Sequence, residues 1–196
     1  DKCVVSGALT GLSNSGGMLG YYSGQITDSY SHVDVDCPNA DAIGGLVGNG
    51  WGDMRRCGAT GNVNGRNKVG GLAGNDYNNH QQGPLFALGN VTGNSQVGGV
   101  FGFYQTATYY DVYSTGNVTG VDQVGGVVGR SEPWGNIHRA YAIGRVNSEG
   151  EGGGVVGSAH ADAGTVNNCY WNVESTGQEV SLGGSPKTTI EMLEQE

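Results

Sequence analysis

Asp34 and Asp36 are the residues of this chain best placed for acid–base chemistry. They stand two apart in the run His-Val-Asp-Val-Asp at residues 32–36. On a β-strand both carboxylates would therefore point to the same side, beside the His32 ring. Two carboxylates in distinct environments are what glycoside hydrolysis requires, and carboxylates next to a histidine are potential metal ligands.

The neighbouring repeats complete neither kind of site. Their equivalent positions hold neutral residues: Ala8, Thr10, Asn62 and Asn64. We therefore interpret the acidic pair as solvated surface residues. The sequence predicts no catalytic residue, no metal and no cofactor, and the protein is expected not to be an enzyme.

Uncharged residues suited to ligand binding recur at regular spacing. Threonine and asparagine side chains offer hydrogen bonds, and tyrosines beside them offer flat apolar rings on which a sugar could stack. The candidate ligand-binding residues are Tyr113, Tyr141, Thr115, Asn117, Thr119, Asn90, Thr92, Thr60 and Asn62. The alternative is structural, because a column of aromatic rings also stabilises the stacking of strands. Trp51 and Trp134 fall in segments of variable length that we expect to be loops, and both are candidate loop-binding residues.

A repeat that runs through the chain must position these residues. The motif Gly-Gly-apolar-apolar-Gly begins at residues 16, 44, 70, 98, 125 and 153, in steps of 28, 26, 28, 27 and 28 residues. A half-motif of the form Thr-Gly-Asn-Val-Thr-Gly, as at residues 115–120, keeps the same phase. A fixed period in this range is typical of solenoids, in which each repeat packs on its neighbours.

Side chains alternate along the half-motif, as in a half-buried strand. In the repeat at residues 112–119, the inward set is predicted to be Val112, Ser114, Gly116 and Val118. The residues that alternate with them then face outward: Tyr113, Thr115, Asn117 and Thr119. Ile43, Val69, Val97 and Val124, which precede the glycine motif, are further predicted core residues.

The predicted fold is all-β: a parallel β-solenoid of about seven rungs, with repeats of ~27 residues and a short C-terminal cap. Residues 1–177 form the repeat array and residues 178–196 the cap or tail. A short acidic helix is expected over 186–196, because Thr188 and Glu191 have the spacing of a capping box.

The four cysteines are expected to be buried thiols. Cys3 and Cys57 share a phase but lie two rungs apart, which places their Cα atoms ~9.6 Å from each other at ~4.8 Å per rung. This separation exceeds the ~7 Å limit for a disulfide.

Charge and hydropathy exclude several partners. The formal net charge is −9, and 14% of residues are charged. An acidic chain without a basic stripe lacks the groups that neutralise nucleic-acid phosphates, so no nucleic acid is expected as a partner. No apolar run approaches the ~20 residues of a membrane span, so direct membrane insertion is not expected either.

The repeats resemble a known family. Residues 44–48 (Gly-Gly-Leu-Val-Gly), residues 70–74 (Gly-Gly-Leu-Ala-Gly), the three full Gly-Asn-Val half-motifs and the run Cys-Tyr-Trp-Asn at 169–172 are similar to GLUG repeats. That family comprises bacterial modules of filamentous-haemagglutinin-like adhesins and IgA-directed metallopeptidases. The resemblance implies a segment of a larger secreted or surface protein. The first two repeats depart most from the pattern, with Val33 at a glycine position.

Three functions are compatible with these features. The first is a non-enzymatic extracellular module of a bacterial secreted or surface protein, acting as an adhesin stalk or as a face that binds a glycan or protein. The second is ice binding by the Thr/Asn face, which Asp34, Asp36 and Arg145 on that face disfavour. The third is an accessory domain of a secreted peptidase or polysaccharide-degrading enzyme.

Overall fold

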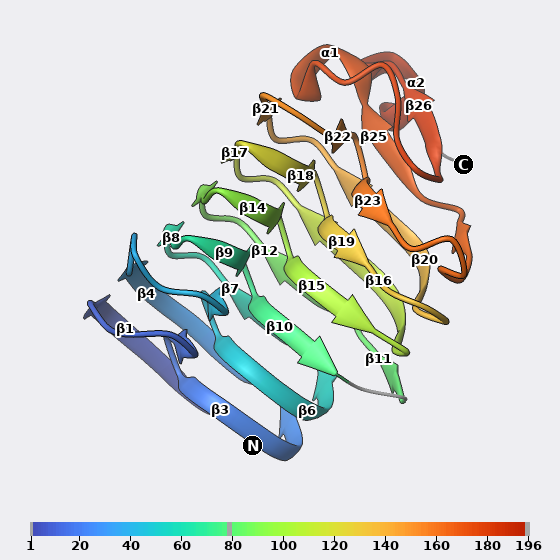
Figure 1. Cartoon of the computed structure of the whole chain (residues 1–196). Coiled ribbons are helices and arrows are strands. Elements are labelled where there is room, and N and C mark those ends of the chain that lie inside the picture. Colours follow the sequence, from blue (N-terminus) through green and yellow to red (C-terminus); the bar gives the residue numbers. More distant parts are fainter. Residues whose placement is uncertain (1, 78–79, 195–196) are drawn as a thin grey trace.

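The chain winds into a parallel β-solenoid. The computed structural model describes residues 2–77 and 80–194, and Figure 1 shows the rungs stacked from the N-terminal end to the C-terminal helices. Each rung passes through three sheets, here named A, B and C, and sheets B and C contain six strands each. The predicted all-β solenoid is therefore confirmed, with about six complete turns and a partial C-terminal one.

Sheet A is the longest of the three and carries the half-motif. Its strands are β1 (Val4–Leu9), β4 (Tyr30–Asp36), β7 (Cys57–Ala59), β8 (Val63–Asn64), β11 (Gln81–Gln82), β12 (Leu85–Ala87), β13 (Val91–Thr92), β16 (Thr108–Ser114), β17 (Val118–Gly120), β20 (Asn136–Ala142), β21 (Val146–Ser148), β24 (Val166–Asn167), β25 (Tyr170–Asn172) and β26 (Ser185–Lys187). From the third rung to the sixth, the predicted strand is interrupted at the Thr-Gly-Asn segment or its equivalent and continues as a second short strand.

Sheets B and C share the glycine motif between them. Sheet B comprises β2 (Ser15–Gly16), β5 (Ile43–Gly44), β9 (Asn67–Gly70), β14 (Ser95–Gly98), β18 (Asp122–Gly125) and β22 (Gly152–Gly153). Sheet C comprises β3 (Leu19–Thr27), β6 (Val47–Arg55), β10 (Ala73–Tyr77), β15 (Phe101–Gln105), β19 (Val128–Ser131) and β23 (Val156–Ala159). The chain bends inside the motif, so that its first glycine ends a strand of sheet B and its last two residues begin a strand of sheet C.

The predicted alternation of side chains is confirmed. Val112, Ser114 and Val118 are buried, whereas Asn117 and Thr119 are exposed. The four aliphatic residues ahead of the glycine motif have no exposed surface: Ile43, Val69, Val97 and Val124. They belong to one of two apolar clusters, and the other cluster fills the space between sheets A and C.

Glycine is required where sheet A meets the bend between sheets B and C. A Cβ on Gly71 would lie 2.2 Å from the carbonyl oxygen of Gly99 and 2.8 Å from the Cβ of Ala87. In the first five motifs, the second glycine makes the same approach to the equivalent glycine of the next rung and to a small residue of sheet A. The small residues are Ser31, Ala59, Ala87, Ser114 and Ala142.

The two ends of the solenoid differ. At the C-terminal end Trp171, buried, takes the place of the small residues and lies against Gly154. Two short helices follow, α1 (Val173–Thr176) and α2 (Thr189–Leu193), and the capping box of Thr188 and Glu191 forms at the start of α2. The helix is shorter than expected, because residues 185–187 form β26.

The cysteines are all reduced thiols. Cys37, Cys57 and Cys169 are buried as predicted. Burial raises the pKa of the Cys57 and Cys169 thiols, and Cys57 Sγ donates to the carbonyl oxygen of Arg55 at 3.3 Å. The prediction for Cys3 is wrong: it is exposed, because it lies in the first rung. Neither α1 nor α2 nor any other described helix is long enough to span a membrane.

Substitution of Gly71 by Ala should destabilise the solenoid by about 1–3 kcal/mol, because the new methyl group meets backbone atoms that cannot move aside. The measurement is the midpoint of chemical unfolding followed by circular dichroism. Gly11→Ala is the matched control, since the nearest atom to its Cβ is the Ser15 hydroxyl, at the end of a side chain. Equal midpoints for the two variants would contradict the close-approach argument.

Candidate ligand-binding faces

The aromatic column lies on the outer face of sheet A as a continuous stack. Ring centroids are 6.0 Å apart for Tyr30 and Phe86, 5.4 Å for Phe86 and Tyr113, and 5.2 Å for Tyr113 and Tyr141. The last two rings are tilted by only 5°. Gly58 occupies the same column between Tyr30 and Phe86, and the Phe86 ring covers the space that a side chain there would need.

This geometry favours the structural alternative for Tyr113, whereas Tyr141 stacks on Tyr113 and is 38% exposed. A sugar stacks on the face of a ring, but the faces of the Tyr113 ring lie against Phe86 and Tyr141. Its edge is what remains toward solvent, and the residue is half-buried. Such stacked pairs contribute ~0.5–1.5 kcal/mol beyond the area they bury.

The predicted asparagines form a ladder rather than a free lattice. The Oδ1 atom of Asn62 accepts the backbone N–H of Asn90 at 3.0 Å, and Asn90 Oδ1 accepts that of Asn117 at 3.0 Å. Asn117 Oδ1 in turn accepts the N–H of Arg145 at 3.0 Å. Each side chain thus supplies a hydrogen bond to the next rung at the point where the sheet A strand is interrupted.

The predicted threonines make fewer contacts between rungs than the asparagines do. Thr92 and Thr119 are exposed and adjacent in register, and Thr115 is half-buried beside the aromatic stack. Thr60 Oγ1 lies 2.7 Å from His32 Nδ1 in the previous rung. The structure therefore brings all nine predicted residues onto one face, with the rings and the amide oxygens used between rungs.

The acidic pair belongs to the same face. Asp34 Oδ1 accepts the backbone N–H of Asn62 at 2.7 Å, and Asp36 Oδ1 accepts from Asn64 Nδ2 at 2.8 Å. Asp34 is thus the first member of the asparagine ladder. These contacts give both carboxylates a structural partner in the next rung.

The two tryptophans occupy different settings. Trp134 lies on a turn between β19 and β20 and is 68% exposed. The prediction that Trp51 lies in a loop is wrong: it is on the outer side of β6, because the strand that begins in the glycine motif extends through residue 55. Its ring is 62% exposed.

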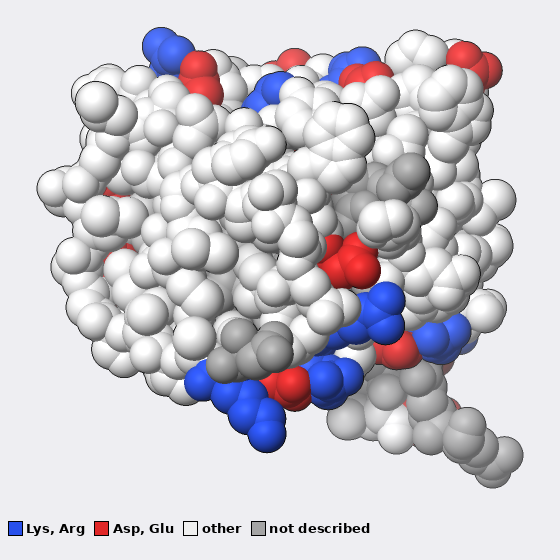
Figure 2. Space-filling model, turned by 90° about the horizontal axis from the view of Figure 1, so that it is seen from below, with Lys and Arg blue, Asp and Glu red and all other residues white. Residues whose placement is uncertain are grey.

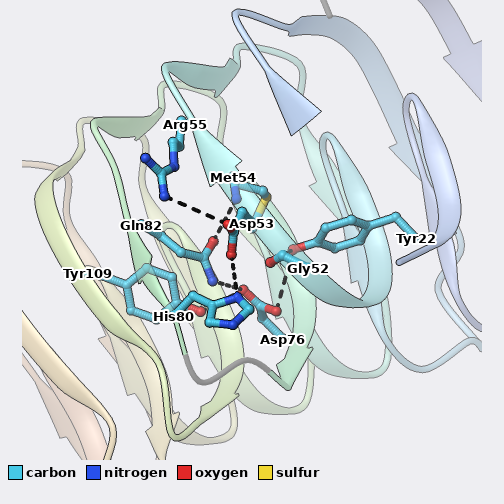
Figure 3. A network of polar contacts seen from close by, with 9 residues as sticks. All are labelled: Tyr22, Gly52, Asp53, Met54, Arg55, Asp76, His80, Gln82 and Tyr109. Atoms are coloured by element: carbon cyan, nitrogen blue, oxygen red, sulfur yellow. Dashed lines mark hydrogen bonds and ion pairs between the residues drawn. The ribbon is translucent and has the colours of Figure 1, made fainter. Parts of the chain in front are cut away.

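A buried polar network lies between sheets A and C, and the sequence reasoning missed it (Figure 3). Asp76, with no exposed surface, accepts hydrogen bonds at Oδ2 from Tyr109 Oη at 2.6 Å and from Gln82 Nε2 at 3.1 Å. Tyr22 Oη lies 3.5 Å from the other carboxyl oxygen and donates to the Gly52 carbonyl at 2.9 Å. Burial raises the Asp76 pKa to about 7, against the opposing effect of the three donors Tyr109, Gln82 and Tyr22.

An exposed cluster lies beside this network. Asp53 Oδ1 is 2.7 Å from His80 Nδ1, and its other oxygen is 3.7 Å from the guanidinium of Arg55. Figure 3 shows these three side chains next to Gln82, whose Oε1 accepts the backbone N–H of Met54 at 3.0 Å. Asp76 can hold a proton near neutral pH, but its complete burial keeps it from any substrate. Its role is therefore structural: it accepts the hydrogen bonds of the polar groups buried around it.

The face shown in Figure 2 is largely uncharged, and its Lys and Arg atoms lie next to Asp and Glu atoms. Bidentate pairs such as Arg56 with Asp28 and Arg139 with Asp111 hold the pKa values of both carboxyls below their usual range. Within residues 2–77 and 80–194, no group of three or more His, Cys, Asp and Glu residues is arranged to hold a metal ion.

Comparison with known proteins identified no relative: no protein-family model, no curated protein and no solved structure matches the chain.

The stability of the protein should fall as the pH rises from about 4 to about 7. Asp76 has a folded-state pKa of about 7 against 3.8 for an ordinary carboxyl, so over this interval the folded state binds more protons than the unfolded state. The contribution of Asp76 to the free energy of unfolding is then greatest below pH ~4 and declines by up to ~1.4 kcal/mol per pH unit until the folded-state pKa is passed. Denaturant unfolding at several pH values measures this slope.

Asp76→Asn should reduce the slope, because the amide does not titrate. Asp111→Asn is the control: its carboxyl has a lowered pKa, so its contribution changes at more acidic pH. An unchanged slope between pH 4 and 7 in Asp76→Asn would show that another group dominates.

Proposed function

We propose that this protein is a non-enzymatic extracellular repeat module of a bacterial secreted or surface protein, and that it acts as a rigid stalk. The resemblance to GLUG repeats supports the host protein and the location. For the outer face of sheet A, we favour a stalk over ligand binding.

One observation carries the choice: the outer columns of sheet A are used for cohesion between rungs. The aromatic stack spans Tyr30 to Tyr141, and the asparagine ladder spans Asp34 to Arg145. Both run parallel to the solenoid axis, which is the direction in which a stalk bears load. Hydrogen bonds and ring contacts repeated along successive rungs resist bending and separation.

Ice binding remains the second candidate for this face, supported by the exposed pair Thr92 and Thr119. The charged members Asp34, Asp36 and Arg145 interrupt the lattice that would have to match ice. An accessory domain of a secreted hydrolase is compatible with the same stalk, because its catalytic part would lie elsewhere in the polypeptide.

Asn90→Ala should lower the stability by about 1 kcal/mol, because the backbone N–H of Asn117 loses its acceptor. Thr92→Ala, two residues further along the same face, is the matched control and should change the stability by less than about 0.5 kcal/mol. Thermal unfolding of the two variants measures the difference.

An assay of ice recrystallisation with the wild-type protein and Thr119→Tyr decides between the stalk and ice binding. The stalk predicts no inhibition of crystal growth by the wild-type protein. Inhibition that Thr119→Tyr abolishes would identify the outer face of sheet A as an ice-binding surface and would refute the stalk as its role.

A further inference from the structure

A second face, on the outer side of sheet C, differs from sheet A in that its polar and aromatic groups are not fully used between rungs. A groove of about 640 Å³ lies at the corner where sheet B turns into sheet C. Six of its lining residues are Asn14, Asn49, Asn67, Lys68, Asn75 and Gln96. We name this feature the amide groove.

Backbone conformation builds one wall of the amide groove. Asn14, Ala42, Lys68 and Gln96 occupy the same position in four successive rungs and have φ values of 61°, 59°, 54° and 57°. This left-handed conformation forms the corner ahead of the first five glycine motifs. The three steps from Asn14 to Gln96 extend the wall over ~14 Å at ~4.8 Å per rung.

A relay of amides forms the other wall. Asn49 on β6 and Asn75 on β10 are register partners. Asn49 Nδ2 donates to Asn14 Oδ1 at 2.9 Å, and Asn75 Nδ2 donates to Asn49 Oδ1 at 3.1 Å. The next member of the column is Phe103, which has no polar side-chain atom to continue the relay.

The relay therefore ends on an unsatisfied acceptor. Asn75 is 3% exposed, and its Oδ1 has no hydrogen-bond partner among the described residues. A buried acceptor left without a donor is destabilising, and a bound donor would remove that cost. Lys68, a flexible side chain in the same groove, has its ammonium 4.2 Å from the Phe103 ring centroid. Displacement of this side chain is the simplest way for an external donor to approach the relay end.

Exposed rings border the amide groove. Trp51 is two residues beyond Asn49 on the same side of β6, ~7 Å away along the strand. Tyr21 on β3 is the register partner of Asn49. Both residues are 62% exposed, and neither ring contacts another ring among the described residues. Unlike the rings of the sheet A stack, they are open to solvent.

We propose that the amide groove and the adjoining rings of Trp51 and Tyr21 bind an oligosaccharide. Sugar hydroxyls supply both donors and acceptors, which matches an end-of-relay amide oxygen beside the amide of Gln96 and the Lys68 ammonium. Pyranose rings present apolar faces that fit open aromatic rings.

A peptide fits this surface less well. β6 and β10 are paired on both sides, so neither offers a free edge to which a peptide strand could add. The carboxylate in the groove, Asp41, is already bound by Arg66 and Asn67. This leaves a mostly neutral polar surface. The inference is independent of the stalk proposal, since a stalk would be rigid with or without a bound sugar.

An array of neutral and acidic oligosaccharides, screened with the intact chain, tests this site. Hits are then titrated calorimetrically with three proteins: wild type, Trp51→Ala and Trp134→Ala. Trp134 is the matched control, because it is a comparably exposed tryptophan outside the groove. Neither substitution touches the core, and circular dichroism verifies that both variants fold.

The expected result is saturable binding that Trp51→Ala weakens tenfold or more and Trp134→Ala leaves unchanged. Gln96→Asn, which shortens a groove side chain and keeps a residue type tolerant of the left-handed conformation, should also weaken binding. Absence of any hit at millimolar sugar, or binding that survives Trp51→Ala, would overturn the proposal. So would selective capture of peptides in a parallel peptide array.

Discussion

Register between rungs is the constraint on which the structure depends. Because every strand pairs in parallel with its counterpart, each side chain meets the equivalent residue of the next rung at ~4.8 Å. Contacts between like groups are then unavoidable, and the chain uses groups that benefit from them: rings stack, amides bond to backbone, and glycines let carbonyls approach. Where charges meet, they alternate in sign, as in Asp28 beside Arg56 and Asp111 beside Arg139.

The interior is regular on one side and irregular on the other. Near sheet B it is narrow, and aliphatic residues and glycines fill it. Between sheets C and A the segments vary in length, and large side chains such as Tyr104, Tyr109 and Phe101 take up the space. Tyr109 brings its hydroxyl into this region with Asp76, so the polar network follows from the need to satisfy the groups that a wide interior admits.

The repeat made most of the fold predictable. A period of ~27 residues with two-residue alternation was enough to predict the columns on sheet A and the buried Val69 and Val97. Three features were outside its reach. The bend inside the glycine motif depends on contacts between rungs, the shortened α2 depends on β26 pairing with β25, and the exposure of Cys3 depends on its position at the end of the stack.

The candidate site was harder to predict than the fold. Asn90 and Asn117 were placed on the correct face, but sequence alone does not say whether an outward amide bonds to the next rung or to a ligand. Asn75 and Asp76 lie in a segment of variable length, where the alternation was not extended.

The missing aromatic ring at Gly58 shows how a repeat array can tolerate substitutions. One repeat lacks its ring, yet Phe86 fills the empty space and still reaches Tyr30 across it. A column can therefore lose a member without losing continuity, provided that the neighbour is large and free to lean. Duplicated repeats joined in this way can drift individually, and the loss in one copy is absorbed by the next. No neighbour can compensate in this way for a substitution of the inward glycines, because a side chain there would meet backbone atoms. They therefore recur at the same position in every repeat, whereas the outer columns vary.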